Sequence, residues 1–310
     1  MRYSFRQLEV FAAIGQYGTV SDAADRLSMS QSAASTSLSE LELQFDCRLF
    51  DRTGKRLRLN EAGRSLLPKA RELLDRANEV EAMLAAGTLF GSLRVGATLT
   101  IGNYLATLLV GEFMVRHPGS RVALEVNNTT RIAERVKDFE LDLGLIEGES
   151  YDSELEMTDW IADELAVFCA PDHPLVRRRK VNINHVLEEY WIVREPGSGT
   201  RQTLDRAMRL WHERWKIRLE LEHTEAIMHA VQAGLGIGCV SRLALKESFR
   251  RGSLIELKLA ELDLSRKFHF LLHRQKYRTP GIDAFLMLCR EVSSKAARSD
   301  EIVIQRSVSE

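Results

Sequence analysis

The sequence predicts an α/β protein that carries a separate, mainly helical domain at its N-terminus. In residues 5–86 apolar side chains recur at the three- and four-residue spacing of helices. After residue 92 short apolar runs alternate with helical stretches, as parallel βαβ units require. Between these parts lies GTLFGS, residues 87–92, which is short, carries glycines and follows a long helix, so we place a hinge there.

Composition narrows the class of protein. With 310 residues, 45% of them hydrophobic and 28% charged, the chain suits a globular protein of two or three domains. No apolar run approaches the roughly 20 residues of a membrane span, and the N-terminus lacks signal-peptide features, so we expect a cytoplasmic protein. The four cysteines are widely spaced, which argues against disulfides and a structural zinc site.

Three helices are predicted before residue 46. The first, FRQLEVFAAIGQY, ends at Gly18. Ser21 is expected to cap a short second helix, DAADRL, and Ser30 a third helix that runs from Gln31 to about Phe45. Two short helices joined by such a turn indicate a helix-turn-helix.

The third helix has an apolar inward stripe and a polar leading end. The predicted stripe consists of Ala34, Leu38, Leu41 and Phe45. Small hydroxyl and amide side chains on the outward end let a helix enter the major groove and bond base edges and phosphates. The alternative is that the serines only cap and solvate the helix.

A basic hairpin follows. LFDRTGKRLRLN predicts two strands with a tight turn at Thr53-Gly54, and residues 48–58 hold five cations against Asp51 alone. Cations placed there can contact phosphates, so the domain is predicted to be an all-α winged helix-turn-helix within residues 1–60. The predicted DNA contacts are Ser30, Gln31, Ser32, Ser35, Thr36, Arg52, Lys55 and Arg56.

Asn60 is expected to cap a long linker helix over residues 61–86, with an apolar stripe that includes Leu66, Leu73 and Val80. Its length favours pairing with the same helix of a second subunit. We therefore expect a homodimer or a homotetramer.

The remaining chain predicts two α/β lobes. We place one lobe at residues 93–163 and 268–297 and the other at 164–267, and expect the tail, 298–310, to be loosely held. The run RRRK at 177–180 is either a nucleic-acid patch or a solvated loop, and its place in the second lobe favours the loop.

Ligands of such sheets bind beyond the carboxyl ends of the strands, where helix N-termini present N–H groups. The loops at 98–101 and 196–201 satisfy this condition in different lobes, so both can face one cleft, although ordinary helix capping would explain either alone. Their hydroxyls and backbone amides favour a small oxyanion or carboxylate. A carboxylate at Glu147 would repel a bare anion unless it is protonated or paired with an arginine. The predicted effector contacts are Thr98, Leu99, Thr100, Glu147, Arg194, Ser198, Gly199, Thr200 and Arg201.

The run from Phe5 to Ala70 closely resembles the DNA-binding domain of LysR-type transcriptional regulators, and similar features continue through the chain. The resemblance implies a dimer or tetramer that binds double-stranded promoter DNA, is tuned by a small effector and has RNA polymerase as a further partner. It also implies an effector domain of two α/β lobes resembling type 2 periplasmic binding proteins. By position, Gln31, Ser32 and Ser35 resemble recognition-helix contacts and Arg52 the wing contact, whereas Thr36 departs from the arginine of many members.

TLTIGNYL, GLIEG and REPGSGTR are similar to the branch of that family associated with sulfur metabolism and redox balance. Thr98, Thr100 and Thr200 match positions that bind an anion in sulfur-assimilation members. The resemblance therefore implies sulfite, sulfate or a related small anion as effector, and no cofactor or metal. The alternative is a binding module or enzyme of periplasmic-binding-protein shape with an N-terminal interaction domain, although no HExxH, GxSxG or P-loop motif supports an enzyme.

Overall fold

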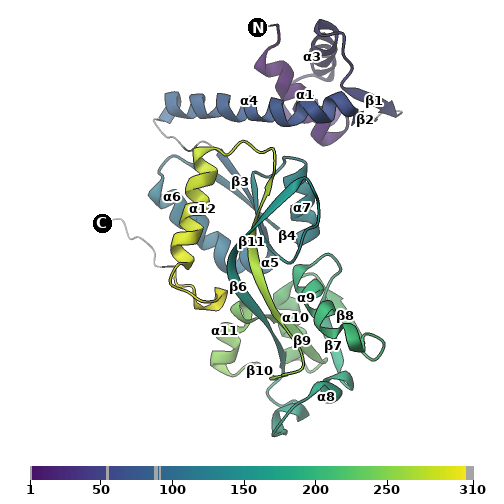
Figure 1. The fold of residues 1–310 in the computed structure, drawn as a ribbon, viewed down its shortest axis with the longest axis vertical. Coiled ribbons are helices and arrows are strands. Elements are labelled where there is room, and N and C mark those ends of the chain that lie inside the picture. Colours follow the sequence, from purple (N-terminus) through teal and green to yellow (C-terminus); the bar gives the residue numbers. More distant parts are fainter. Residues whose placement is uncertain (1, 54–55, 87–89, 91, 305–310) are drawn as a thin grey trace.

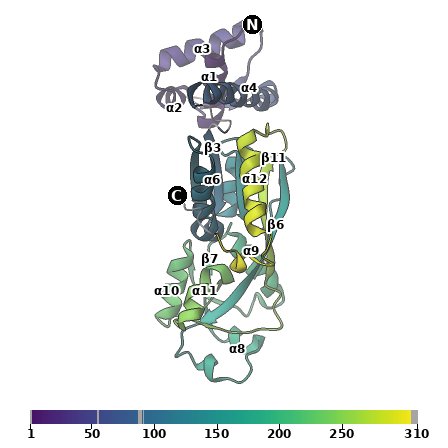
Figure 2. The ribbon, with the colours of Figure 1, turned by 90° about the vertical axis from the view of Figure 1, so that its left-hand side faces the viewer.

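The computed structural model describes residues 2–53, 56–86, 90 and 92–304. Its N-terminal domain contains helices α1 (Phe5–Tyr17), α2 (Val20–Arg26) and α3 (Gln31–Gln44), the antiparallel strands β1 (Phe50–Thr53) and β2 (Arg56–Leu59), and the long helix α4 (Glu61–Ala86). Figures 1 and 2 show this domain and α4 at one end of the molecule, with the two lobes following. The winged helix-turn-helix is confirmed.

Local capping chemistry sets the helix boundaries. Gly18 ends α1 in the left-handed region, and the Ser30 hydroxyl accepts a hydrogen bond from the Ala33 N–H, both as predicted. The predicted cap of α2 is wrong, because Thr19 and not Ser21 accepts from the Asp22 N–H. Thr19 is the extended residue that directly follows the glycine turn, so its hydroxyl reaches the first turn of α2 before Ser21 can.

The core of the N-terminal domain contains Phe11, Ala24, Ala34 and Leu38, which are all buried. Phe45 was predicted to belong to this stripe, and that prediction is wrong, because 49% of the residue is exposed. The reason is that α3 ends at Gln44, so Phe45 leaves the helical spacing that the inward stripe requires.

The two lobes share one nine-stranded sheet, in the order β4-β3-β5-β11-β6-β9-β7-β8, with β10 paired to β6. Strands β3, β4 and β5 are parallel in the first lobe, and β7, β8 and β9 in the second. Strands β6 and β11 are antiparallel to each other and run through both lobes (Figure 1). The strand bounds are β3 Ser92–Thr98, β4 Arg121–Asn127, β5 Leu143–Glu147, β6 Leu155–Cys169, β7 Tyr190–Arg194, β8 Lys216–Leu221, β9 Ile237–Ser241, β10 Ile255–Glu256 and β11 Ser265–His273.

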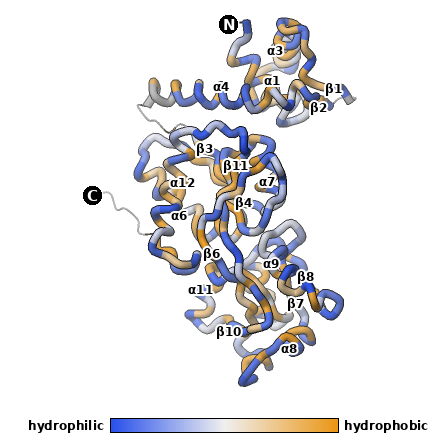
Figure 3. Tube along the Cα trace, viewed as in Figure 1, coloured by the Kyte–Doolittle hydropathy of each residue, from blue (hydrophilic) through white to orange (hydrophobic). Residues whose placement is uncertain are grey.

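Helices cover this sheet and give each lobe its own apolar core, visible as hydrophobic strands inside hydrophilic loops in Figure 3. The helix bounds are α5 Leu99–Ile101, η1 Gly102–Ala106, α6 Thr107–Arg116, α7 Thr129–Lys137, η2 Pro174–Arg177, α8 Ile183–Leu187, α9 Gly199–Met208, η3 Arg209–Trp211, α10 Thr224–Gln232, α11 Arg242–Arg251, α12 Pro280–Ser293 and η4 Ser299–Glu301. In the described parts of the chain no helix combines the length and hydropathy needed to cross a membrane.

The beginning of the predicted tail is not loosely held. Ser299 is fully buried and its hydroxyl donates to Asp163, while Ile302 and Ile304 pack against the core of the first lobe. The Lys246 ammonium donates to the Asp300 carbonyl at 2.6 Å. A single bridge between Ala162 and Arg298 adds this segment to β6, so the prediction is wrong for residues 298–304. Residues 305–310 lie outside the described part, as do most residues of the predicted hinge.

A buried ion network joins α4 to the first lobe. The Lys276 ammonium pairs with Asp75 of α4 and lies 2.9 Å from the Asp142 carboxylate. The Arg94 guanidinium forms a second ion pair with Asp142 at 2.7 Å. Burial opposes ionisation of Asp142, but the charges of Lys276 and Arg94 outweigh it and lower its pKa to about 2. The network thus joins four charged groups, of which Lys276 and Asp142 are buried, and it fixes α4 against the first lobe.

Candidate DNA-binding and effector sites

The leading end of α3 is free to meet a partner. Gln31, Ser32, Ser35 and Thr36 are all exposed, as the outward face predicted. The Ser30 hydroxyl lies 3.0 Å from the Ser32 hydroxyl and already caps the helix. Ser30 therefore has a structural role as the cap of the helix. Within the described chain, Ser32 makes only the contact with Ser30, and the side chains of Gln31, Ser35 and Thr36 make no hydrogen bond or ion pair.

The wing presents cations without internal partners. Arg48, Arg52, Arg56 and Arg58 are exposed or half-buried, and in the residues that the structure describes none of them pairs with a carboxylate. Strand pairing sets Arg52 opposite Leu57 and Thr53 opposite Arg56. Lys55, a predicted contact, lies outside the described residues. Unpaired cations beside an exposed helix end form a surface that attracts phosphates.

In the effector domain, the structure brings together most of the residues predicted from the two loops. The Thr100 hydroxyl donates to Glu147 Oε1 at 2.9 Å and the Thr200 hydroxyl reaches the same oxygen at 3.4 Å. The Thr98 hydroxyl accepts from the Glu147 N–H at 3.2 Å. Residues from β3, α5, β5 and α9 therefore converge on Glu147, and all are buried.

Sequence reasoning missed the cation at the centre of this cluster. The guanidinium of Arg266, on β11, donates to the Thr200 hydroxyl at 3.0 Å and to Asp163 at 2.6 Å, and lies 3.6 Å from Glu147 Oε2. Burial opposes its charge, but Glu147 and Asp163 outweigh that cost and raise the pKa of Arg266. Arg266, Phe268 and Phe270 are every second residue of β11 and share its inward face. This period-two spacing was the sequence signal that could have placed Arg266 inside the domain.

Two glycines allow the lobes to approach each other here. A Cβ on Gly199 would lie 1.7 Å from the Glu147 carbonyl oxygen, and one on Gly148 would lie 2.7 Å from Gly199 Cα. The Gly199 N–H donates to Thr129, whose hydroxyl donates to the Glu147 carbonyl at 2.6 Å. The first turn of α9 therefore rests directly on the end of β5, and Thr129 is a further site residue that the sequence did not single out.

Of the remaining predicted effector residues, two are arginines that pair with carboxylates other than Glu147, and two are buried residues next to site residues in the chain. Arg201 pairs with Asp205 and Glu220 of the second lobe, so its guanidinium is engaged away from Glu147. Arg194 is buried and pairs with Glu195. Leu99 and Ser198 are also buried, beside Thr98 and Gly199 respectively in the chain. Leu99 offers only an apolar side chain.

Several buried polar atoms around this site have no hydrogen-bond partner. They are Glu147 Oε2, Arg266 Nη2, Ser198 Oγ and Arg194 Nη1. A cavity of about 1070 Å³ adjoins the site and is lined by Gly148, Thr203 and Arg266, though by none of the predicted effector residues. The structure thus shows a closed site beside an open cavity. Within the described residues no group of histidines, cysteines and carboxylates forms a metal site.

A winged helix-turn-helix joined to a two-lobed domain with such a site defines a DNA-binding regulator that senses a ligand. The sequence matches the bacterial regulatory helix-turn-helix protein, lysR family, over residues 5–64 and the LysR substrate binding domain over residues 86–294. The chain belongs to the LysR family of transcriptional regulators. It is therefore a regulator and not an enzyme, which decides between the two classes weighed from the sequence.

Individual proteins agree with this assignment. The chain is 38% identical over 289 residues to the uncharacterized HTH-type transcriptional regulator YeiE of Escherichia coli K12, covering 93% of this chain and 98% of the relative. The regulatory domain of CcmR from Synechocystis PCC6803 in complex with 2-PG is 28% identical, with a TM-score of 0.62 over 66% of this chain and 98% of that one. Full-length OxyR from Pseudomonas aeruginosa, 21% identical, has a TM-score of 0.67 over 93% of this chain and 97% of its own.

Proposed function

We propose that this regulator is a cytoplasmic homodimer or homotetramer that binds promoter DNA through the end of α3 and the wing. A small oxyanion, such as sulfite, sulfate or a related anion, binds between the lobes and tunes that binding. RNA polymerase is the further partner of the complex. The observation that carries the effector proposal is the cluster of buried polar groups around Glu147 and Arg266, whose Oε2 and Nη2 atoms form an ion pair at 3.6 Å but make no hydrogen bond.

Unpaired polar atoms are rare in protein interiors because each one costs free energy. An oxyanion would accept hydrogen bonds from Arg266 Nη2 and Ser198 Oγ, which lack acceptors in the closed site. Glu147 Oε2 lacks a donor, which favours an anion that retains a proton on oxygen. The related CcmR domain, in complex with 2-PG, supports a small-molecule ligand at this fold.

The repulsion expected from Glu147 is offset by an arginine, which the sequence left unidentified. Arg266 lies 3.6 Å from Glu147 Oε2, but it also neutralises Asp163. The three groups together carry a net charge of −1, so an incoming anion still meets a negative site. We therefore expect binding to depend on Arg266 and to be opposed by the charge of Glu147.

The apolar stripe of α4 supports a dimer. The first half of α4 packs on α1, but Leu73, Val80 and Leu84 remain exposed, the last by 83%. An apolar cavity of about 420 Å³, lined by Leu41, Phe45, Leu66 and Leu73 among others, adjoins the start of the helix. Figure 3 shows both hydrophobic and hydrophilic residues along α4, and the exposed apolar side chains recur at seven- and four-residue spacing, as expected of a helix that pairs along one face.

The DNA-binding assignment is tested by Arg52→Ala. We expect the variant to bind a duplex from the upstream region of its own gene more weakly and to lower the slope of log K against log salt by about 1, because one phosphate contact is lost. Fluorescence anisotropy across salt concentrations measures both. Arg177→Ala removes the same charge from the second lobe and should leave both values unchanged; equal behaviour of the two variants would contradict the wing contact.

The effector assignment is tested by thermal unfolding of the full-length protein with sulfite, sulfate and phosphate. A saturating anion at about 100 times its Kd stabilises the folded state by about 2.7 kcal/mol, which raises the unfolding temperature measurably. Chloride at equal ionic strength is the control. If no oxyanion raises the unfolding temperature beyond chloride, the proposed ligand class is wrong.

A further inference from the structure

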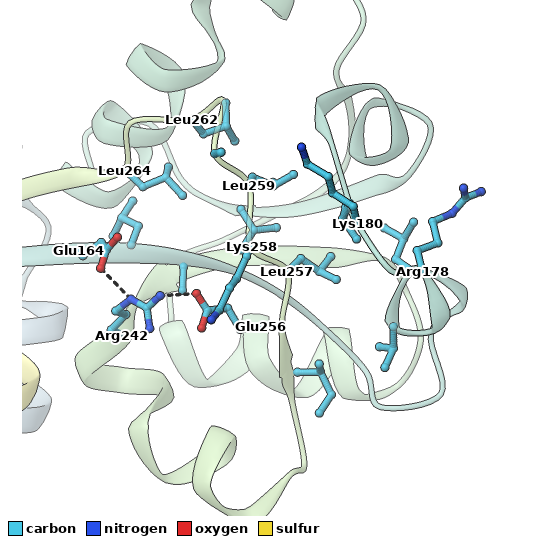
Figure 4. Close-up of a pocket in the computed structure, with 18 of the residues that line it drawn as sticks. Glu164, Arg178, Lys180, Arg242, Glu256, Leu257, Lys258, Leu259, Leu262 and Leu264 are labelled. Atoms are coloured by element: carbon cyan, nitrogen blue, oxygen red, sulfur yellow. Dashed lines mark hydrogen bonds and ion pairs between the residues drawn. The ribbon is translucent and has the colours of Figure 1, made fainter.

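A second cavity lies in the second lobe, apart from the site around Glu147. Its volume is about 630 Å³, and its lining comes from the η2 turn and the residues after it, the segment 255–264 and the end of β6. Figure 4 shows Leu257, Leu259 and Leu262 at its wall. A pocket of several hundred cubic ångströms with leucines in its wall suits an organic molecule better than a bare inorganic anion.

The lining is strongly cationic. It holds five cations and two carboxylates, a net charge of +3 in a chain whose net charge is −1. Both carboxylates are already paired, because Arg242 donates to Glu164 at 2.8 Å and also to Glu256 (Figure 4), and Arg298 lies 3.1 Å from Glu164. The four other cations have no carboxylate partner in the described chain: Arg178, Arg179, Lys180 and Lys258.

The cavity is separate from the effector site. Asp163 and Glu164 are neighbours on β6, and successive side chains of a strand point to opposite faces. Asp163 binds Arg266 in the effector site, whereas Glu164 lines the cavity and binds Arg242. None of the residues that line the cavity belongs to the effector cluster, so a molecule in the cavity occupies a different site.

We propose that this cavity binds an organic carboxylate with an apolar body of medium length. The body packs against the leucine wall, and the carboxylate pairs with Lys180 or Lys258 at the rim. This assigns a role to the basic run at 177–180, of which Arg178, Arg179 and Lys180 line the cavity and Arg177 does not. Nucleic acid is disfavoured, because phosphate contacts do not require an apolar cavity beneath the cations.

The test is calorimetric titration of the full-length protein with octanoate. Saturable binding of one octanoate per chain is expected, with octan-1-ol and acetate at least about tenfold weaker, because the first lacks the charge and the second the apolar body. Absence of saturable octanoate binding, or equal binding of all three probes, would overturn the proposal.

Variants locate the site. Lys180→Glu and Lys258→Glu should each weaken octanoate binding at least about tenfold by repelling the carboxylate, while Arg177→Glu makes the same charge change outside the cavity and should keep wild-type affinity. Loss in Arg177→Glu equal to that in Lys180→Glu would place the binding elsewhere.

Discussion

Replacing Arg266 by methionine is expected to weaken oxyanion binding about 10- to 100-fold and to destabilise the protein by about 3–5 kcal/mol. The variant removes a buried cation that faces Glu147, Asp163 and Thr200, and within the described residues it leaves two buried carboxylates without a counter-ion. Calorimetric titration with the anion that raises the unfolding temperature measures affinity. Urea unfolding measures stability.

Glu147→Gln separates the two effects. It keeps a hydrogen-bond acceptor for Thr100 but removes one negative charge, so we expect the oxyanion to bind about tenfold more tightly, opposite in sign to Arg266→Met. If both variants bound the anion with wild-type affinity, the ligand would not contact this cluster. If both variants lost affinity for the oxyanion, the charge argument would be wrong, but the assignment of the binding site to this cluster would remain supported.

Replacing Gly199 by alanine is expected to abolish the response to the oxyanion and to lower the unfolding temperature by several degrees. The added Cβ would lie 1.7 Å from the oxygen and 2.4 Å from the carbon of the Glu147 carbonyl, so α9 must move away from β5. Overpacking of this kind costs about 1–3 kcal/mol or more, and it separates Thr200 from the carboxylate it binds. Thermal unfolding with and without the anion measures both consequences.

Gly111→Ala is the matched control, because a Cβ at Gly111 of α6 meets no atom within 4 Å. Alanine is the better helix former, so this variant should be as stable as the wild type or more stable by about 0.5–1 kcal/mol. A Gly199→Ala protein that unfolds and responds to the anion like the Gly111→Ala protein would show that the close contact between α9 and β5 is not needed.

Three strands also connect the effector site to the linker helix. Strand β3 carries Arg94 near its start and ends at Thr98, and β5 follows Asp142 and ends at Glu147. Strand β11 begins beside Arg266, and Lys276 follows its other end. Each strand thus has an effector-site residue at one end and a member of the α4 ion network at the other, which neither periodicity nor motif indicated.

What the sequence determined by itself is mostly local. Apolar periodicity and capping residues predicted α1, α3, the wing and α4, because a hydroxyl or a glycine acts within one turn of its own position. Even there Ser21 and Phe45 were misassigned, since the competing cap Thr19 lies only two positions before Ser21 and α3 ends one residue before Phe45. The two lobes and the loops around Thr98 and Thr200 followed from alternating strands and helices.

Only the tertiary structure decided which charges share a buried site. Arg266 and Asp163 lie 103 residues apart in the chain, yet they form an ion pair beside Glu147 at the centre of the cleft. The anchored segment 298–304 and the cationic cavity beside Lys180 likewise depend on strands that meet from distant parts of the chain. Burial and charge pairing are properties of packed neighbours in space, and so residue order alone did not reveal them.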